Sequence, residues 1–185
     1  MSDSLKKVSK RARHYEHVLV LMRHAKAEPA GSGADIDREL TDKGLKQAKH
    51  VAKGLAAMKL TPNAILCSGA VRTRQTVARM LKVFGDAPSV EYRKSLYEQS
   101  KGVVFDELAT AKDSTRELLI VGHEPTVSIA SGQIATKDSD AGLLALLSVG
   151  VSNASAVILG SDAPFAQWDH HSAELIAVLT PKDFS

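Results

Sequence analysis

Residues 17–24 read HVLVLMRH, an apolar run that ends in two basic side chains. Its central apolar run at 18–22, with two β-branched valines, is typical of a strand buried on both faces of a parallel sheet. Two more short apolar runs follow, AILC at 64–67 and LLIV at 118–121. The three runs predict three strands of one sheet.

Amphipathic segments separate these strands. Behind Thr41, a residue type favoured at helix N-caps, apolar residues such as Leu45, Val51 and Leu55 recur at helical spacing. A second series of this kind runs from 70 to 84. Strands that alternate with amphipathic helices predict an α/β fold, a three-layer αβα sandwich with a mostly parallel central sheet. Shorter elements are predicted at 90–92, 103–108, from 125, near 139–148, at 156–159 and at 175–179.

The charge of the chain is unevenly distributed. The 185 residues contain 24 Lys and Arg against 21 Asp and Glu, which gives a net charge of +3 and a pI near 9.0. Five of these basic residues and only two acidic ones lie in residues 1–16, so the remainder is electrically balanced. The first segment is polar and shows no clear periodicity. We therefore expect a basic, flexible N-terminal arm at 1–16 and a single domain at 17–185.

Composition narrows the classes of function. Cys67 is the only cysteine, which excludes an internal disulfide and a cysteine-based metal site, and its apolar surroundings indicate a small buried hydrophobe. His170 and His171 have no carboxylate or cysteine at useful spacing, so we expect no metal there. No apolar run approaches the roughly 18 residues of a membrane span, and the run at 18–22 is too short for a signal peptide. We expect a cytoplasmic protein without a membrane partner.

The basic pI also raises the question of nucleic acid. The net positive charge lies in the arm, and aromatic residues make up only 4% of the chain, which leaves little for stacking bases. Nucleic acid is therefore not the expected partner.

Polar side chains follow each of the three apolar runs. Arg23 and His24 end the first, Ser68 ends the second with Arg72 just beyond it, and His123 follows the third. The carboxyl ends of parallel strands share one edge, where ligands bind. Crowding two arginines and two histidines is costly without a counter-ion, and phosphate oxygens match the arginine fork. The sequence therefore predicts a phosphate site at this edge.

The same side chains predict a reaction. A neutral imidazole is a good nucleophile near pH 7, so one histidine can attack phosphorus. The other histidine and the two arginines can stabilise the charge that spreads over the transition state. Because fixed cations perform this task, we expect no metal and no other cofactor.

These residues resemble the motifs of the histidine phosphatase (phosphoglycerate-mutase-like) superfamily. LMRHA at 21–25 resembles its R-H-G motif, SGAVRTRQT at 68–76 is similar to its S-x-x-x-R-[AT]-x-x-T stretch, and LIVGHEP at 119–125 resembles its second-histidine motif. The short SixA-type phosphohistidine phosphatases look closest, because DRELTDKG at 37–44 resembles their D-x-x-R-x-L-T-x-x-G loop and PKDF at 181–184 is also similar. The resemblance spans about residues 17–184.

The resemblance implies a phosphoglycerate-mutase-like fold, a catalytic domain at 17–185 and a role for each matching residue. His24 would be the nucleophile and would pass through a phosphohistidine intermediate. Glu98 would correspond to the proton donor, and Arg38 would help to bind the substrate. A further group of side chains would hold the phosphoryl group: Arg23, Arg72 and His123.

The sequence departs from the family pattern at two places. Ala25 replaces the usual Gly after the nucleophile, and Gly69 stands where Pro is frequent. The chain is also short: only 24 residues separate Glu98 from His123, where larger members of the superfamily insert a cap. The resemblance therefore implies a shallow, open site, which suits a phosphorylated side chain of a protein.

Three alternatives stay open at this point. The protein could be a phosphatase or mutase of small phosphate esters. It could also be a module that binds a phosphorylated ligand without catalysis, or a protein that uses its basic arm on nucleic acid. The pairing of His24 with Arg72 and His123 favours a catalytic function over the last two.

Overall fold

A six-stranded sheet forms the centre of the protein, in the order β3-β2-β4-β1-β5-β6. The computed structural model describes residues 1–100 and 102–184. Strands β3, β2, β4 and β1 pair in parallel, β5 is antiparallel to β1, and β6 is antiparallel to β5. The prediction of a mostly parallel sheet is confirmed. The strands span these ranges: β1 His17–Arg23, β2 Ala64–Ser68, β3 Ser89–Arg93, β4 Glu117–Gly122, β5 Ala156–Ser161 and β6 Glu174–Leu179.

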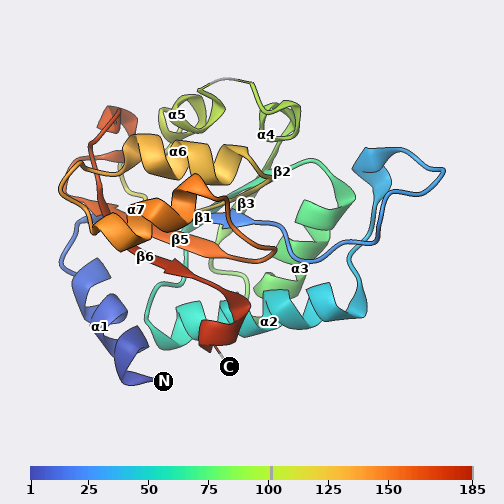
Figure 1. Ribbon diagram of the computed structural model, residues 1–185, viewed down its shortest axis with the longest axis horizontal. Helices are drawn as coiled ribbons and strands as arrows, with labels where there is room; N and C mark the ends of the chain where they lie inside the picture. Colours follow the sequence, from blue (N-terminus) through green and yellow to red (C-terminus); the bar gives the residue numbers. More distant parts are fainter. Residues whose placement is uncertain (101, 185) are drawn as a thin grey trace.

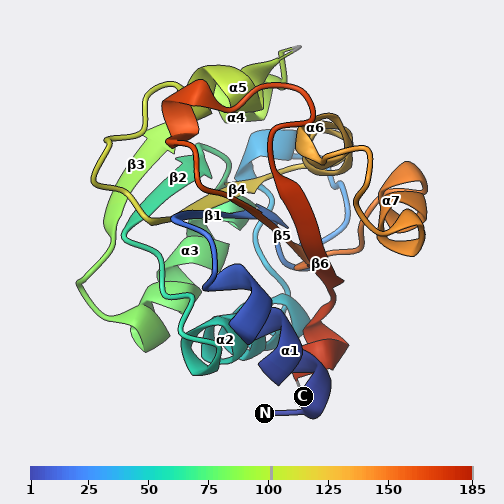
Figure 2. The ribbon, with the colours of Figure 1, turned by 90° about the vertical axis from the view of Figure 1, so that its left-hand side faces the viewer.

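Helices cover both faces of the sheet, so the predicted three-layer sandwich is confirmed (Figures 1 and 2). One layer contains α1 Asp3–Ala12, α2 Asp42–Ala57, α3 Val71–Phe84 and the terminal turn η3 Pro181–Phe184. The other contains α4 Lys94–Glu98, α5 Val103–Leu108, α6 Thr126–Ile134 and α7 Ala141–Ser148. Two short 3-10 turns, η1 Asp35–Asp37 and η2 Phe165–Gln167, lie in loops. Within the described residues, no helix is both long and apolar enough to cross a membrane.

Strand β1 contributes side chains to the hydrophobic clusters on both faces of the sheet. Val18, Val20 and Met22 pack toward the α2 and α3 side, whereas Leu19 and Leu21 pack toward α5 and α6. All five side chains are buried, because successive residues of a strand point to opposite faces. This is the physical reason why the apolar run that begins at 18 shows no alternation. The apolar run ends where the strand reaches the edge of the sheet. Arg23 and His24 follow it there, at the candidate site.

Helix α2 presses against the loop that follows His24. Thr41 caps the helix as predicted, since its hydroxyl accepts a hydrogen bond from the amide of Gly44 at 3.0 Å. The Thr41 amide in turn donates to the carbonyl of Lys26 at 3.0 Å. A Cβ on Gly44 would lie 2.1 Å from that carbonyl oxygen, so only glycine permits this approach. The contact fixes the chain two residues beyond His24.

The predicted flexible arm is wrong for residues 3–12, which form helix α1. Leu5 and Ala12 are buried against the core, and Ser9 is buried because its hydroxyl donates to the carbonyl of Met58 at 2.7 Å. Arg11 and Tyr15 both bind the carboxylate of Glu174 on β6. The residues that α1 buries, Leu5, Ser9 and Ala12, recur at helical spacing, but the stripe is short and contains a serine. Only the carbonyl supplied by the end of α2 makes that serine suitable for burial.

Candidate active site

Three strands bring the predicted residues together at one edge of the sheet. β1 ends at Arg23 with His24 next, β4 ends just before His123, and α3 places Arg72 in its first turn after β2. His24 and His123 lie with their ring centroids 5.3 Å apart. The guanidinium of Arg72 lies between them. It donates from Nε to His24 Nε2 at 3.3 Å and lies 3.3 Å from His123 Nδ1 through its NH2 group.

The orientation of His24 suits a nucleophile. Its Nδ1 lies 2.8 Å from the carbonyl oxygen of Ala25, and that oxygen can only accept a hydrogen bond. The Nδ1 atom therefore carries the proton and the lone pair is on Nε2, which faces Arg72. The Ala25 amide is held in turn by the hydroxyl of Thr76 at 3.1 Å. The backbone after His24 thus fixes both the tautomer and the direction of its ring.

His123 has a complementary arrangement. Its Nε2 lies 2.7 Å from the hydroxyl of Ser68 at the end of β2. Because the Arg72 NH2 group can only donate, His123 Nδ1 accepts from it and Nε2–H donates to Ser68. A bound phosphoryl group would compete for Arg72 and favour a protonated His123, which then donates from Nδ1 to an oxygen.

Both histidines are held in the neutral form in the free site. Burial lowers the pKa of His24 to about 4; the hydrogen bond to Ala25 opposes this effect, and the charges of Arg72, Arg23 and Arg38 add to it. Burial, with the charges of Arg72 and His24, lowers the pKa of His123 to about 3. A neutral imidazole with a free Nε2 is the nucleophilic form.

This shift gives a measurable pH dependence. We expect His24 of the free protein to stay neutral down to about pH 5, well below the ordinary histidine pKa of about 6.5. The free energy of unfolding should decline as pH falls from about 6.5 towards 4, because the unfolded chain takes up protons that the folded site refuses. Imidazole nitrogen NMR across this range, with the His24 signal assigned by its loss in His24→Ala, tests the expectation. A protonation midpoint near 6.5 would contradict it.

Arg23 offers an unused donor beside the histidines. One of its NH1 protons goes to the carbonyl of Val151 at 2.9 Å. Its Nε is buried and has no acceptor among the described residues. A buried N–H without a partner is costly, so the site is suited to an added oxyanion.

Asp35 is a site residue that the sequence analysis missed. Its carboxylate accepts from Arg72 at 3.0 Å and from Arg38 at 2.8 Å, and the Tyr97 hydroxyl donates to it at 3.2 Å. Slight burial tends to raise the pKa of this carboxyl, but the hydrogen bonds from Arg72 and Arg38 outweigh it and lower the pKa. The family loop motif places an aspartate three residues before its arginine, and this spacing falls on Asp35 rather than on Asp37.

The site is more covered than its sequence predicts. His24 and His123 are only 7% and 3% exposed. The loop that carries Asp35 reaches Arg72, and the edge of the Tyr97 ring packs on His123 with centroids 5.7 Å apart. The expectation of a shallow, open site is therefore wrong for the free protein, because a loop and an aromatic ring take the place of a cap.

The carboxylate of Asp35 accepts a hydrogen bond from the Arg72 guanidinium, which a bound phosphoryl group would also need as a donor. We expect Asp35→Ala to lower the inhibition constant of vanadate, a phosphate analogue, by about three- to fivefold, the effect of removing one partly exposed competing ion pair. Asp37→Ala is the matched control, since Asp37 lies in the same turn and is exposed. Steady-state inhibition of aryl phosphate hydrolysis measures the effect. A weaker vanadate affinity in Asp35→Ala would show that the carboxylate positions Arg72 instead of competing for it.

Two predicted residues lie at different distances from this centre. Arg38 is close, since it binds Asp35 and the carbonyl of Glu28, and its charge contributes to the low pKa of His24. The Glu98 carboxylate instead pairs with Lys94 at 3.1 Å on α4, and 56% of its side chain is exposed. The structure therefore does not bring Glu98 into contact with the histidines.

The remaining histidine pair and the cysteine lie outside the site. His170 Nδ1 lies 2.9 Å from the carboxylate of Asp169, and His171 Nδ1 lies 2.9 Å from the carbonyl of Ala135. Their nitrogens thus have separate partners. Cys67 is buried and unpaired in β2.

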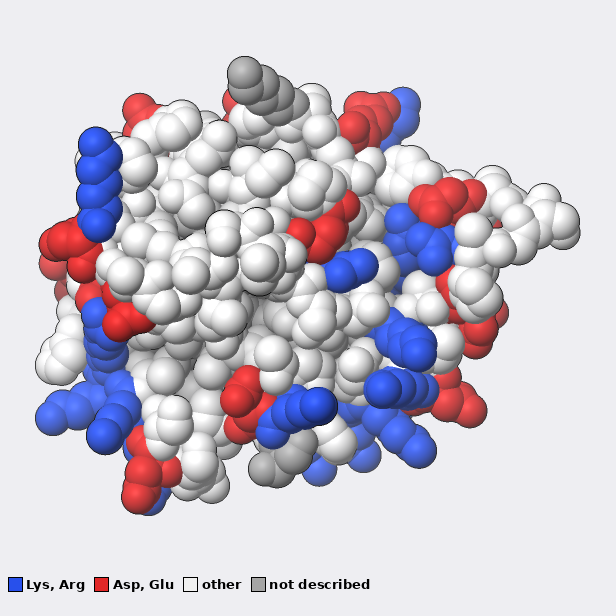
Figure 3. Space-filling model, viewed as in Figure 1, with Lys and Arg blue, Asp and Glu red and all other residues white. Residues whose placement is uncertain are grey.

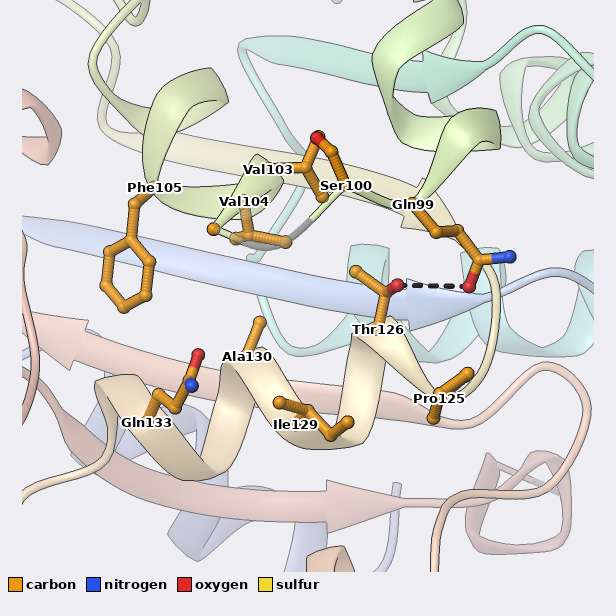
Figure 4. Close-up of a pocket in the computed structure, with 11 residues that line it drawn as sticks. Gln99, Ser100, Val103, Val104, Phe105, Pro125, Thr126, Ile129, Ala130 and Gln133 are labelled. Carbon is orange, nitrogen blue, oxygen red and sulfur yellow. Dashed lines mark hydrogen bonds between the residues drawn. The ribbon is translucent and has the colours of Figure 1, made fainter.

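A cavity of about 470 Å³ lies between α5 and α6, beside the site. Figure 4 shows the side chains of Val104, Ile129 and Ala130 around it, with Thr126 bonded to Gln99 at its rim. Its lining contains none of the predicted site residues. Pro125 connects it to the segment that follows His123.

Comparisons with known proteins agree with this site. The profile of the histidine phosphatase superfamily (branch 1) matches residues 19–117. The uncharacterized protein Rv1276c of Mycobacterium tuberculosis H37Rv is 32% identical over 162 residues, which are 87% of this chain and 100% of that protein. The structure of the "Putative Phosphohistidine Phosphatase SixA" of Nakamurella multipartitia is 30% identical with a TM-score of 0.77, over 89% of this chain and 96% of that one. A structure described in the same words, from Agrobacterium tumefaciens, is 27% identical with a TM-score of 0.73, over 90% and 99%.

Two histidines and two arginines lie together at one edge of the sheet, where they can surround the oxygens of a phosphoryl group. This arrangement defines a phosphatase that uses histidine. This chain belongs to the histidine phosphatase superfamily, branch 1, and among its members resembles the SixA type. The resemblance predicted from the motifs and the phosphoglycerate-mutase-like fold are both confirmed.

Proposed function

We propose that this protein is a metal-independent phosphatase that removes the phosphoryl group from phosphohistidine, or from other phosphorylated residues, on proteins. His24 is the proposed nucleophile. The observation that carries the proposal is the position of its unprotonated Nε2, which accepts a hydrogen bond from Arg72 and lies across from His123.

The proposed reaction has two displacements at phosphorus. His24 Nε2 attacks, the bond from phosphorus to the leaving atom breaks, and the phosphoryl group becomes attached to Nε2. A water molecule then attacks the same phosphorus, which releases inorganic phosphate and returns the lone pair to Nε2. Arg23, Arg72 and His123 hold the equatorial oxygens through both steps, and Arg38 assists at the entrance.

A proton must reach the leaving group in the first displacement. Glu98 is the proposed donor, although its carboxylate has to leave Lys94 to reach the site. The leaving nitrogen of phosphohistidine is an imidazole, which accepts a proton near neutral pH. This substrate therefore depends less on a protein acid than an alkyl phosphate does. The proposal includes no metal and no other cofactor.

Two further observations support a protein substrate in the cytoplasm. Similar solved structures carry the name phosphohistidine phosphatase. Cys67 is buried and unpaired, as is usual for proteins of a reducing compartment.

A phosphatase of small phosphate esters is the second candidate. The cover that Asp35 and Tyr97 form over His24 and His123 favours it, because a small ester passes such a cover more readily than a protein.

Hydrolysis assays in the presence of EDTA test the proposal and separate the two candidates. We expect the wild-type protein to hydrolyse an aryl phosphate and a phosphohistidine peptide, with a higher kcat/KM for the peptide than for small alkyl phosphates. Loss of all activity in EDTA would reject the metal-independent mechanism. A higher kcat/KM for an alkyl ester than for the peptide would favour the second candidate.

A further inference from the structure

A second cavity, of about 590 Å³, opens on the other side of the nucleophile loop, between the first half of α2 and the segment after β6. Four lysines line it: Lys26, Lys43, Lys46 and Lys182. We call it the lysine cavity. His50, Gln47, Asn153 and Thr180 also contribute to its wall.

The lysine cavity concentrates charge on a part of the chain that is neutral overall. Its lining contains no Asp or Glu, and all four lysines are exposed. Within residues 1–100 and 102–184, no carboxylate lies within ion-pair distance of these four ammonium groups. The neighbouring Asp183 is already bound to the amide and hydroxyl of Thr180. Figure 3 shows Lys and Arg side chains gathered over the α2 region, at the lower right of that view.

The cavity and the active site share one wall. Lys26 is two residues from His24, and its amide donates to the side chain of Gln47 on α2 at 3.0 Å. The Asn153 side chain, which lines the cavity, donates to the carbonyl oxygen of His24 itself at 3.5 Å. The lysine cavity therefore adjoins the backbone of His24, and a substrate segment that leaves the site on this side would pass these lysines.

We propose that the lysine cavity binds an acidic segment of the protein substrate that flanks the phosphorylated residue. This inference rests on the proposed function and specifies that the substrate carries negative charge beside its phosphorylated residue. Four ammonium groups that have no carboxylate partner among the described residues attract carboxylates over roughly a Debye length, about 10 Å at 0.1 M salt. Lysines act as separate point charges, which suits carboxylates at variable spacing.

The lining favours an acidic protein over nucleic acid. Among the described residues, no Phe, Tyr or Trp lines the cavity, and His50 offers one small ring for stacking a base. The lysines also surround one compact hollow and do not form a long track for a phosphate backbone.

Two phosphohistidine peptides that differ only in three flanking residues, Glu in one and Gln in the other, test the proposal. We expect the wild-type protein to prefer the Glu peptide by about tenfold in kcat/KM, mainly through KM, since three exposed ion pairs act together. The preference should shrink when salt is raised to 1 M. In the variant K43Q/K46Q/K182Q the ratio should fall to about one- to twofold, while aryl phosphate hydrolysis is unchanged and shows that the fold is intact.

The variant K7Q/K10Q/K112Q is the matched control, because it removes three exposed lysines that do not line the cavity. It should keep the wild-type preference. An equal preference in wild type and K43Q/K46Q/K182Q, with the Glu peptide hydrolysed by both, would overturn this inference and leave the proposed function intact. Inhibition of the wild type by oligo(dT), absent in the variant and not matched by polyglutamate, would assign the cavity to nucleic acid and overturn it as well. Failure of the wild type to hydrolyse either peptide, with aryl phosphate still turned over, would instead overturn the protein substrate proposed above.

Discussion

His24→Ala is expected to lower kcat for an aryl phosphate by about ten-thousand-fold or more, the scale seen when a covalent nucleophile is removed from an enzyme. The physical reason is that the carbonyl of Ala25 holds the His24 proton on Nδ1, so that the Nε2 lone pair points towards Arg72, where a phosphoryl group would lie. The variant should also fail to retain radiolabelled phosphate after an alkaline denaturing quench, which preserves phosphohistidine, whereas the wild-type protein becomes labelled.

His14→Ala is the control for this prediction, because His14 is an exposed histidine remote from the site in the fold. It should keep full activity and full labelling. Turnover of His24→Ala within tenfold of the wild type would reject a mechanism through this residue. Labelling of the variant at another position would identify a different nucleophile.

Arg72→Ala is expected to lower kcat by about a thousand-fold, the upper range for loss of one preorganised donor to a transition state. Its guanidinium contacts both histidines and is 5% exposed, so its charge acts where water screens little. Arg72→Lys keeps the charge but loses the planar fork, and we expect a loss of about a hundredfold. Steady-state kinetics on an aryl phosphate measures both variants.

Arg74→Ala is the matched control on the same helix. Arg74 is exposed and lies over the ring of Tyr92, 4.8 Å from its centroid, away from the histidines. It should change kcat by less than about twofold, as is usual for an exposed surface side chain. An Arg72→Lys variant as active as the wild type would show that a single charge suffices and that the fork has no role.

The motifs alone were enough to place four residues of the site. Arg23, His24, Arg72 and His123 each follow an apolar run, and the ends of parallel strands meet at one edge by geometry. Local sequence fixes such an arrangement because each residue is positioned by the strand directly before it. The Thr41 cap was predictable for the same reason, since its partner is three residues away.

Groups whose partners are distant in the sequence were not predictable. Asp35 meets Arg72 across 37 residues, and Ser9 meets Met58 across 49. The spacing of the loop motif identifies Asp35 as a candidate, but nothing near Asp35 or Ser9 in the sequence reveals these partners. The Glu98 carboxylate differs, because its partner Lys94 is four residues away on the same helix, and such a pair is visible in the sequence.

The class of fold, the candidate nucleophile and the candidate phosphate-binding side chains could therefore be predicted from the sequence, because these depend on strand ends and on short motifs. The packing of α1 on the core, the contact of Asp35 with Arg72 and the position of Lys182 beside the lysines of α2 became visible only in the folded protein. Each of these depends on burial or charge shared between segments far apart in the chain. Such contacts form only when the sheet has brought those segments together.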